Sequence, residues 1–225
     1  MVKHSTTGIP FVTVKFAQSL DGRIATATGD SQWISSSGAR RFAHQLRREH
    51  DAIMVGIGTV LADDPQLSVR LVRGRDPLRI VVDSTLRIPL TTRVLADGAA
   101  NHTLVVTSEA AEISREREIA GLGAEVLRLP SGPDHSGINI ELLLEELARR
   151  GIASVLVEGG KGMITSLLAA RAVDRLVAVI APKIIGEGTE AVGDLGITRL
   201  DDAITFSSVK TRKLGPDIVF DGRLK

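Results

Sequence analysis

The stretch Val155-Leu-Val-Glu-Gly-Gly-Lys-Gly-Met-Ile-Thr-Ser-Leu-Leu168 decides the fold. Residues 152–157 form a short apolar run rich in β-branched side chains, which predicts a buried parallel strand. The run ends at Glu158 and three glycines, and apolar side chains then recur at helical spacing over residues 163–168. A strand, a glycine turn and a helix in this order predict a crossover unit of an α/β protein.

The glycine turn, made by Gly159, Gly160 and Gly162, suits a phosphate group. Glycine lets a ligand approach the main chain, and the first turn of a helix offers unpaired N–H groups at its positive end. The spacing Gly160-x-Gly162-x-x-Thr165 lacks the last glycine of the dinucleotide fingerprint, and no Walker sequence is present. A tight turn without a ligand is the structural alternative. Glu158 favours a site, because open α/β sheets bind ligands at the carboxyl ends of their strands.

Composition excludes several classes of function. The 225 residues favour one large domain, and 28 basic residues nearly cancel 27 acidic ones without a basic run, which argues against nucleic acid as a partner. The absence of cysteine excludes disulfides and thiolate metal sites, and the five histidines lack ligand spacing, so we predict no metal. Residues 1–10 lack the apolar run of a signal peptide, and no stretch is long enough to span a membrane. We therefore expect a cytoplasmic protein without membrane contact.

Strands and helices alternate along the chain. Strands are predicted at residues 11–17, 51–55, 78–82, 103–106, 125–129, 152–157 and 174–181, and helices at 38–50, 114–120 and 140–148. Residues 204–211 and 217–220 favour a terminal antiparallel pair, while 18–24 and 61–65 favour turns. Within the first strand, Lys15 shares a face with Ala17.

The predicted helix 38–50 carries a cluster of basic side chains. Arg40, His44, Arg47 and Arg48 are expected to cluster on one side of it, and serines 35–37 supply candidates for its N-cap. Such a face is usually only solvated, and a phosphate partner is the alternative. Trp33, the only tryptophan, lies in a polar loop, where a packing role competes with that of a ligand platform. Asp64 precedes Pro65 and is expected to serve as a turn or capping residue.

Five motifs, taken in order, resemble the pyrimidine-reductase family of riboflavin biosynthesis. They are Phe11-Val-Thr-Val-Lys-Phe-Ala-Gln-Ser-Leu-Asp-Gly-Arg-Ile24, Ala52-Ile-Met-Val-Gly-Ile-Gly-Thr-Val-Leu-Ala-Asp-Asp-Pro65, Pro77-Leu-Arg-Ile-Val-Val-Asp-Ser84, Leu156-Val-Glu-Gly-Gly160 and Ile180-Ala-Pro-Lys183. Many bacterial members carry an N-terminal zinc deaminase, whose His-x-Glu and Pro-Cys-x-x-Cys ligands are absent from this sequence. The resemblance therefore indicates the reductase alone.

The resemblance implies an α/β, single-domain dihydrofolate-reductase-like fold. Its mixed, mostly parallel central sheet would be flanked by helices and extended by the C-terminal antiparallel pair, with residues 10–225 as the domain and 1–9 as a tail. The family's reaction is NADPH-dependent reduction of a ribosylaminopyrimidine 5′-phosphate to the ribitylamino product. The resemblance also implies a homodimer, and the apolar residues 173–185 could form its interface.

The resemblance also implies the residues of the site. Contacts to the cofactor NADPH are expected from Ala17, Trp33, Thr59, Asp63, Ser84, Gly160, Lys161, Gly162, Met163, Ile164, Thr165 and Ser166. Contacts to the substrate are expected from Ser31, Arg47, Leu67, Arg70 and Glu158.

Physical chemistry suggests roles for these groups. Arg47 and Arg70 can make charge-assisted bonds to the substrate phosphate, with Ser31 as a neutral donor. Lys15 and Glu158 are the groups we expect at the reacting carbon, with a structural ion pair between them as the alternative. Two other readings stay open: a dihydropterin reductase on the same fold, and a catalytically silent nucleotide-binding module. The sequence leaves open whether the substrate base is the 2-amino pyrimidinone or the deaminated uracil form.

Overall fold

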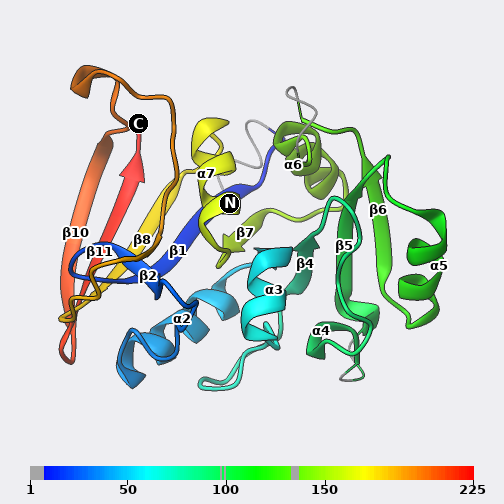
Figure 1. Ribbon diagram of the computed structural model, residues 1–225, viewed down its shortest axis with the longest axis horizontal. Helices are drawn as coiled ribbons and strands as arrows, with labels where there is room; N and C mark the ends of the chain where they lie inside the picture. Colours follow the sequence, from blue (N-terminus) through cyan, green and yellow to red (C-terminus); the bar gives the residue numbers. More distant parts are fainter. Residues whose placement is uncertain (1–7, 97, 99, 133–136) are drawn as a thin grey trace.

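A computed structural model describes residues 8–96, 98, 100–132 and 137–225. In these residues the main sheet has nine strands in the order β10-β11-β8-β1-β7-β3-β4-β5-β6 (Figure 1). The bounds are β10 Phe206–Leu214, β11 Asp217–Leu224, β8 Arg175–Ala181, β1 Phe11–Ser19, β7 Ser154–Val157, β3 Ala52–Gly56, β4 Leu78–Val82, β5 Thr103–Ser108 and β6 Glu125–Leu129. The strands from β8 to β6 run parallel, and β10 and β11 are antiparallel.

Helices cover both faces of this sheet. They are α2 Ser37–Glu49, α3 Ile57–Asp63, α4 Arg93–Ala96, α5 Ile113–Gly121, α6 Ile140–Arg149 and α7 Lys161–Ala169, with short 3₁₀ turns at Ala100–His102 and Leu200–Asp202. Figure 1 shows α6 and α7 on one side of the strands and α2, α3 and α4 on the other. The mixed, mostly parallel sheet with its C-terminal antiparallel pair confirms the predicted fold class.

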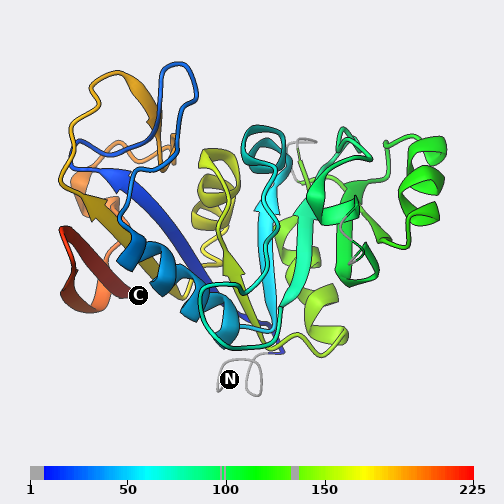
Figure 2. The ribbon, with the colours of Figure 1, turned by 90° about the horizontal axis from the view of Figure 1, so that it is seen from below.

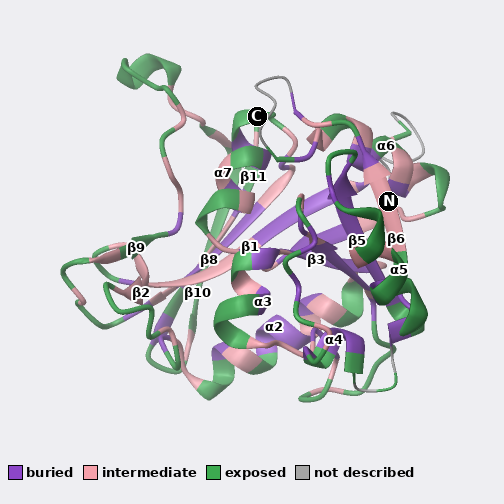
Figure 3. Ribbon diagram, turned by 45° about the vertical axis from the view of Figure 1, so that its right-hand side comes forward, coloured by how far each residue is buried: buried purple, intermediate pink, exposed green. Residues whose placement is uncertain are grey.

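The core follows the alternation of side chains along the strands. On one face, Val12 and Val14 of β1 pack with residues of α6 and α7. On the other face, α2 packs on Leu156 of β7 and Val177 of β8, while α3, α4 and α5 cover the neighbouring strands. The central strands are buried, whereas β10 and the outer helix faces are exposed (Figure 3). Because β1 alternates as predicted, Lys15 lies on the α2 face of the sheet.

The glycine turn explains how β7 and β3 approach one another. A Cβ atom placed on Gly159 would lie 3.1 Å from the Gly56 nitrogen and 3.3 Å from the Val55 Cα, which is tighter than most Cβ contacts in proteins. Gly56 is the N-cap of α3, and Gly160 is the N-cap of α7. Both helices therefore begin side by side at the carboxyl ends of adjacent strands.

Two expectations about local structure were wrong. The helix α3 runs through residues predicted as a turn, because Ile57 and Val60 are buried against the sheet and supply the apolar face that two glycines obscured. The turn predicted at 18–24 is shorter, since β1 extends to Ser19 and β2 (Arg23–Thr26) pairs with β9 (Gly188–Glu190) in a separate two-stranded sheet. Figure 2 shows this small sheet apart from the main one, at the upper left.

The apolar residues 173–185, expected to supply a dimer interface, belong mostly to the core of the chain. Strand β8, which makes up most of that range, is hydrogen-bonded to β11 on one side and to β1 on the other. Its side chains Val177 and Val179 are buried in the core, and only the residues after it, such as Ile184, are exposed. The predicted tail at residues 1–9 lies mostly outside the described residues, which begin at Gly8.

Candidate active site

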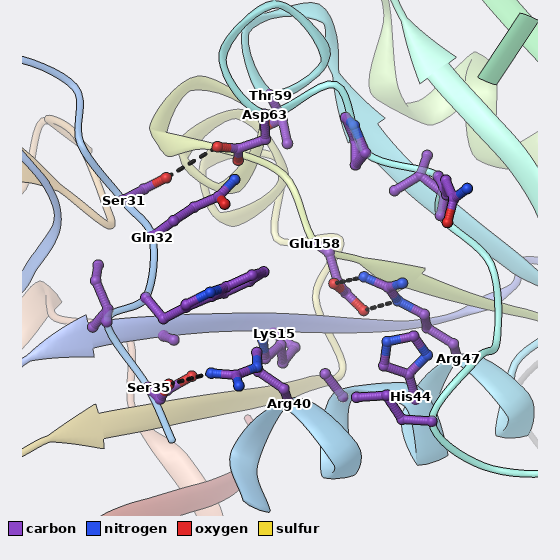
Figure 4. A pocket seen from close by; sticks show the side chains of 18 of the residues that line it. Lys15, Ser31, Gln32, Ser35, Arg40, His44, Arg47, Thr59, Asp63 and Glu158 are labelled. Atoms are coloured by element: carbon purple, nitrogen blue, oxygen red, sulfur yellow. Dashed lines mark hydrogen bonds and ion pairs between the residues drawn. The ribbon is translucent and has the colours of Figure 1, made fainter. Parts of the chain in front are cut away.

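A cavity of about 790 Å³ lies on the α2 face of the sheet. Its walls come from β1, α2, α3, the end of β7 and the loops at residues 31–35 and 64–71 (Figure 4). The residues that line it are Lys15, Ala17, Ile24, Ser31, Gln32, Trp33, Ile34, Ser35, Arg40, Ala43, His44, Arg47, Thr59, Asp63, Asp64, Pro65, Gln66, Leu67, Arg70, Leu71, Arg93 and Glu158. Charged groups are therefore concentrated in one half-enclosed space.

The centre of the cavity is an ion pair between Arg47 and Glu158. Arg47 Nε donates to Glu158 Oε1 at 2.9 Å, and Arg47 Nη2 donates to Oε2 at 2.8 Å. Arg47 Nη1 also donates to the Ser68 carbonyl at 3.0 Å. Both side chains of the pair are 12% exposed, so each charge is stabilised mainly by its partner and little by water. Glu158 therefore forms its ion pair with Arg47 and not with Lys15, which was the structural alternative.

Two charges set the protonation of Glu158. Burial works to raise its pKa, but the charge and hydrogen bonds of Arg47 and the charge of Lys15 outweigh burial and hold the pKa at about 2. The carboxylate is therefore ionised at neutral pH and can accept hydrogen bonds, but it has no proton to give. A carboxylate in this state is suited to accepting hydrogen bonds from a ligand.

Lys15 has the opposite character. Burial lowers the pKa of its ammonium and Arg47 adds to that effect, while Glu158 partly offsets it. Within the described part of the chain, the Lys15 Nζ makes no hydrogen bond or ion pair. An amine with a lowered pKa and no structural partner is suited to exchange a proton with a ligand.

A histidine that was not assigned a role from the sequence completes this cluster. His44 lies one turn before Arg47 on α2, and its Nδ1 accepts a hydrogen bond from the Arg70 backbone N–H at 3.0 Å. Burial, followed by the charge of Arg47, lowers the pKa of His44 to about 4. The imidazole is therefore neutral at pH 7.

The tryptophan wall of the cavity is held from two sides. The Arg40 guanidinium lies 4.5 Å from the centroid of the Trp33 ring and donates to the Ser35 carbonyl at 3.1 Å. Lys183 Nζ donates to the Trp33 carbonyl at 2.6 Å. Trp33 lines the cavity and remains 62% exposed, so its ring is accessible and is not packed in the core.

Positive charge without a carboxylate partner lines the other wall. Arg70 and Arg93 make no ion pair among the described residues, and burial together with the charges of Arg47 and Arg93 lowers the pKa of Arg70. The loop between α3 and Arg70 has positive φ at Asp64 and Leu67, and Asp64 Oδ1 accepts the Arg93 backbone N–H at 2.8 Å. This wall is suited to an anion.

The glycine turn lies next to the cavity and contributes none of its lining residues. The Gly160 N–H donates to Thr59 Oγ1 at 2.9 Å, so α3 and α7 are linked at their first turns. Lys161 turns away toward the small sheet, where its Nζ lies 3.2 Å from Glu190 Oε2. Thr165 Oγ1 accepts the Gly193 N–H at 2.7 Å.

The predicted residues therefore fall into two groups. The cavity brings together Lys15, Ala17, Ser31, Trp33, Arg47, Thr59, Asp63, Leu67, Arg70 and Glu158. Ser84 at the end of β4 and the residues from Gly160 to Ser166 lie outside its walls. Among the polar and charged lining residues, sequence reasoning gave no site role to Gln32, Ser35, Arg40, His44, Asp64, Gln66 and Arg93. Arg40 and His44 share the basic face of α2, and that face was the available signal.

Two of the predicted residues also contact each other. Ser31 Oγ donates to Asp63 Oδ1 at 3.0 Å, which connects a predicted substrate residue with a predicted cofactor residue. The side chain of Leu67 is 1% exposed, so its main chain is the part that can reach a ligand. None of the helices in the described residues is long and apolar enough to cross a membrane.

Comparison with known proteins shows the family to which the chain belongs. The model of the RibD C-terminal domain family matches residues 10–220. The chain is 41% identical over 211 residues to the riboflavin biosynthesis protein RibD of Aquifex aeolicus, covering 93% of this chain and 56% of that protein. It is 40% identical over 221 residues to the 2,5-diamino-6-ribosylamino-4(3H)-pyrimidinone 5′-phosphate reductase of Methanothermobacter thermautotrophicus, covering 96% of this chain and 99% of that protein.

Solved structures share the fold. Acinetobacter baumannii RibD superposes with a TM-score of 0.84 at 30% identity, covering 100% of this chain and 60% of that one. Dihydrofolate reductase from Enterococcus faecalis matches with a TM-score of 0.51 at 12% identity over 96% of each chain, which is a likeness of fold alone. The chain spans a little over half the length of the RibD proteins it matches. From the match over residues 10–220 and these relatives, the chain belongs to the RibD C-terminal domain family.

Proposed function

We propose that this chain reduces the ribosyl group of a ribosylaminopyrimidine 5′-phosphate to the ribityl form in riboflavin biosynthesis, with NADPH as the reductant. One observation carries the proposal: a single cavity gathers residues from the predicted catalytic, cofactor and substrate sets. The names of the relatives support it, since one is a riboflavin biosynthesis protein and the other a ribosylaminopyrimidinone phosphate reductase. The proposal makes this chain an oxidoreductase.

The glycine turn supports a dinucleotide beside the cavity. Helix α7 has no side-chain cap, so N–H groups of its first turn are available, and a Cβ atom on Gly162 would meet open space. Thr59 and Trp33 would continue the cofactor contacts into the cavity. When bound, NADPH would supply the hydride, while the protein orients the two reactants and excludes water.

The anion wall supports recognition of the substrate phosphate. Arg70 would bind it, with Ser31 and the Leu67 main chain as neutral donors, and Arg93 would add a second guanidinium. Three of the five N–H groups of Arg47 are used by Glu158 and Ser68. Arg47 would therefore contribute mainly by holding Glu158, and its remaining donors would face the substrate.

Proton transfer would fall to Lys15. Reduction of the opened, imine-like C1′ adds a hydride to carbon and a proton to the attached nitrogen, so a group near C1′ must give up a proton. The lowered pKa of Lys15 brings it toward neutral pH, where a general acid acts best. Glu158, ionised at a pKa of about 2, would accept a hydrogen bond from a sugar hydroxyl and keep the pentose in register.

The test is oxidation of NADPH, followed by absorbance, with the 2-amino pyrimidinone and the deaminated uracil substrates side by side. Turnover of either one supports the proposal and names the base. Absence of turnover with both, while NADPH binds by calorimetry, would overturn it. Turnover of a dihydropterin without a phosphate would favour the other reductase.

Two variants sharpen this test. Arg70→Ala should raise KM for the phosphorylated substrate by roughly ten- to a hundredfold, since charge-assisted bonds are worth about 1.5–3 kcal/mol. Arg48→Ala, on the same helix as Arg47 but outside the cavity walls, is the matched control. An equal effect of both variants would contradict a specific phosphate contact.

The preference for NADPH has its own measurement. Ser84 and Arg87 follow β4, at a position where folds selective for NADH tend to place an acid that binds the ribose hydroxyls. The adjacent Asp83 is an acid and argues the other way. Equal kcat/KM with NADH and NADPH would contradict the preference. If Arg87→Glu leaves the efficiency with NADPH unchanged, Arg87 has no part in it.

We also propose a cytoplasmic homodimer, as the family resemblance implies. Light scattering after size exclusion would measure the mass directly. A mass of one chain at micromolar concentration would contradict the dimer.

A further inference from the structure

His44 is the one neutral ring among the charged side chains at the centre of the cavity. Figure 4 shows its imidazole next to the Arg47–Glu158 pair, with Lys15 nearby. The residue is 6% exposed, and its position on α2 is fixed by packing of the neighbouring Ala43 and Leu46 into the core. The ring therefore has little freedom to turn.

The hydrogen bond to Arg70 fixes the tautomer of this ring. Because Nδ1 accepts the Arg70 backbone N–H at 3.0 Å, Nδ1 carries no proton. The imidazole is neutral, so its one N–H must be at Nε2. Within the described residues, Nε2 has no hydrogen-bond partner.

A neutral donor differs chemically from the groups around it. Lys15 and Arg47 present positive charge, and Glu158 presents negative charge, so each prefers an ionised or strongly polar partner. The Nε2–H of His44 suits an uncharged oxygen such as a hydroxyl, and its ring lies next to the ion pair whose carboxylate, Glu158, accepts hydrogen bonds (Figure 4). A donor and an acceptor side by side can together bind one hydroxyl or two adjacent ones.

We propose that His44 is a substrate-recognition residue that donates its Nε2–H to a hydroxyl oxygen of the pentose, while its Nδ1 holds the main chain of Arg70. The proposal rests on the proposed function, because it takes the pentose phosphate as the ligand. His44 connects the two ends of that ligand: its Nδ1 side positions the anion wall, and its Nε2 side meets the sugar. A site built this way rejects an analogue that lacks the hydroxyl, since the buried donor is then left unpaired.

Three substitutions separate the two sides of the ring. In His44→Gln the terminal amide can replace the Nε2 donor, and the Nδ1 acceptor is lost. In His44→Asn the carbonyl can replace the Nδ1 acceptor, and the Nε2 donor is lost. His44→Phe removes both and keeps the ring volume.

The measurements are kcat and KM for the phosphoribosyl substrate and for its 2′-deoxy and 3′-deoxy analogues, together with the melting temperature and NADPH affinity. We expect His44→Asn to keep the melting temperature and NADPH affinity within error and to lose about tenfold or more in kcat/KM. It should also lose the wild-type discrimination against one deoxy analogue. His44→Gln should retain that discrimination.

A purely structural role gives the reverse order. If His44→Asn behaves like wild type and His44→Gln does not, or if His44→Phe discriminates among the analogues as well as wild type, the substrate contact is overturned. Nitrogen-15 NMR of the wild-type protein covers the case in which a variant fails to fold. A shift of the His44 Nε2 resonance on adding substrate supports the contact, and an unchanged resonance in a saturated complex overturns it.

Failure of the proposed function would be seen separately. In that case wild-type protein would not oxidise NADPH with any phosphoribosyl substrate. An active wild type with unaffected His44 variants would remove only the role of His44.

Discussion

Removing either partner of the Arg47–Glu158 pair should strand a buried charge. We consider Arg47→Met, Glu158→Gln and the double variant, because methionine and glutamine keep the approximate volume of the side chains they replace. Each single variant should lose about 3–5 kcal/mol of unfolding free energy, the usual cost of breaking a buried ion pair. The double variant should lose less than the sum, since it leaves no unpaired charge.

The magnitude of the coupling follows from the carboxylate. Its pKa is held at about 2 where 4.5 is usual. At about 1.4 kcal/mol for each pKa unit, this difference corresponds to about 3 kcal/mol of preferential stabilisation of the ionised form. Because folding lowers the pKa of this carboxyl, the stabilisation is present above pH 4.5 and is lost as the pH falls toward 2.

Urea unfolding of the four proteins at pH 7 gives the coupling free energy directly. The matched control is the pair Arg199–Asp201, which lies 3.4 Å apart with side chains 73% and 87% exposed. It should give a coupling below about 1 kcal/mol. A coupling below about 1 kcal/mol for Arg47–Glu158 as well would refute the argument that Arg47 is what keeps Glu158 ionised.

Three further predictions follow from the same cavity. Lys15→Met should lower kcat by about 10²- to 10⁴-fold. Its melting temperature should be unchanged or higher, because a buried ammonium is replaced by an apolar chain. A variant that unfolds early and turns over normally would show that Lys15 has a structural role instead. Gly160→Val should fold and lose NADPH affinity, since its Cβ meets only Thr59 Oγ1 at 3.5 Å. Gly159→Val should not fold because its Cβ has closer contacts. Retained NADPH affinity in Gly160→Val would show that this turn does not bind the cofactor phosphate. The pKa of His44 is about 4 in the native state and 6.5 when exposed, so wild-type stability should fall between pH 6.5 and 4 as the unfolded state takes up the proton. His44→Gln should be flatter over that range in urea midpoints, and a parallel curve would contradict the buried neutral ring.

Most of the central sheet could be predicted because its strands are short apolar or alternating runs with clear limits. Runs such as residues 78–82 and 125–129 are apolar or alternating and are bounded by turn residues, so their limits were confirmed as β4 and β6. The small sheet of β2 and β9 was missed because its strands have four and three residues and carry no apolar pattern. The helix α3 was missed because Gly56 and Gly58 indicate a turn. In the folded chain, burial of Ile57 and Val60 against the sheet stabilises a helix there.

The composition of the site was more predictable than its pairing. Lys15 was expected at the cleft because it shares a strand face with Ala17, and Glu158 because it ends the strand that leads into the glycine turn; both line the cavity. The partner of Glu158 was not predictable from pattern, since Arg47 is 111 residues away and on a helix. The role of His44 was hidden for the same reason, because its hydrogen bond to Arg70 spans a loop whose path depends on two residues with positive φ.

The order of strands in the sheet also bears on how the chain folds. Strand β1 is the first to be synthesised, yet its neighbours are β7 and β8, with Phe11 opposite Ser154 and Thr13 opposite Arg175. Contacts so distant in sequence close large loops and form slowly. A nascent chain that ends before residue 175 leaves one edge of β1 open, whereas β3, β4, β5 and β6 find partners nearer in sequence. The strand that carries Lys15 is thus made early and enclosed late, and the site it helps to build is completed only after β8 has left the ribosome.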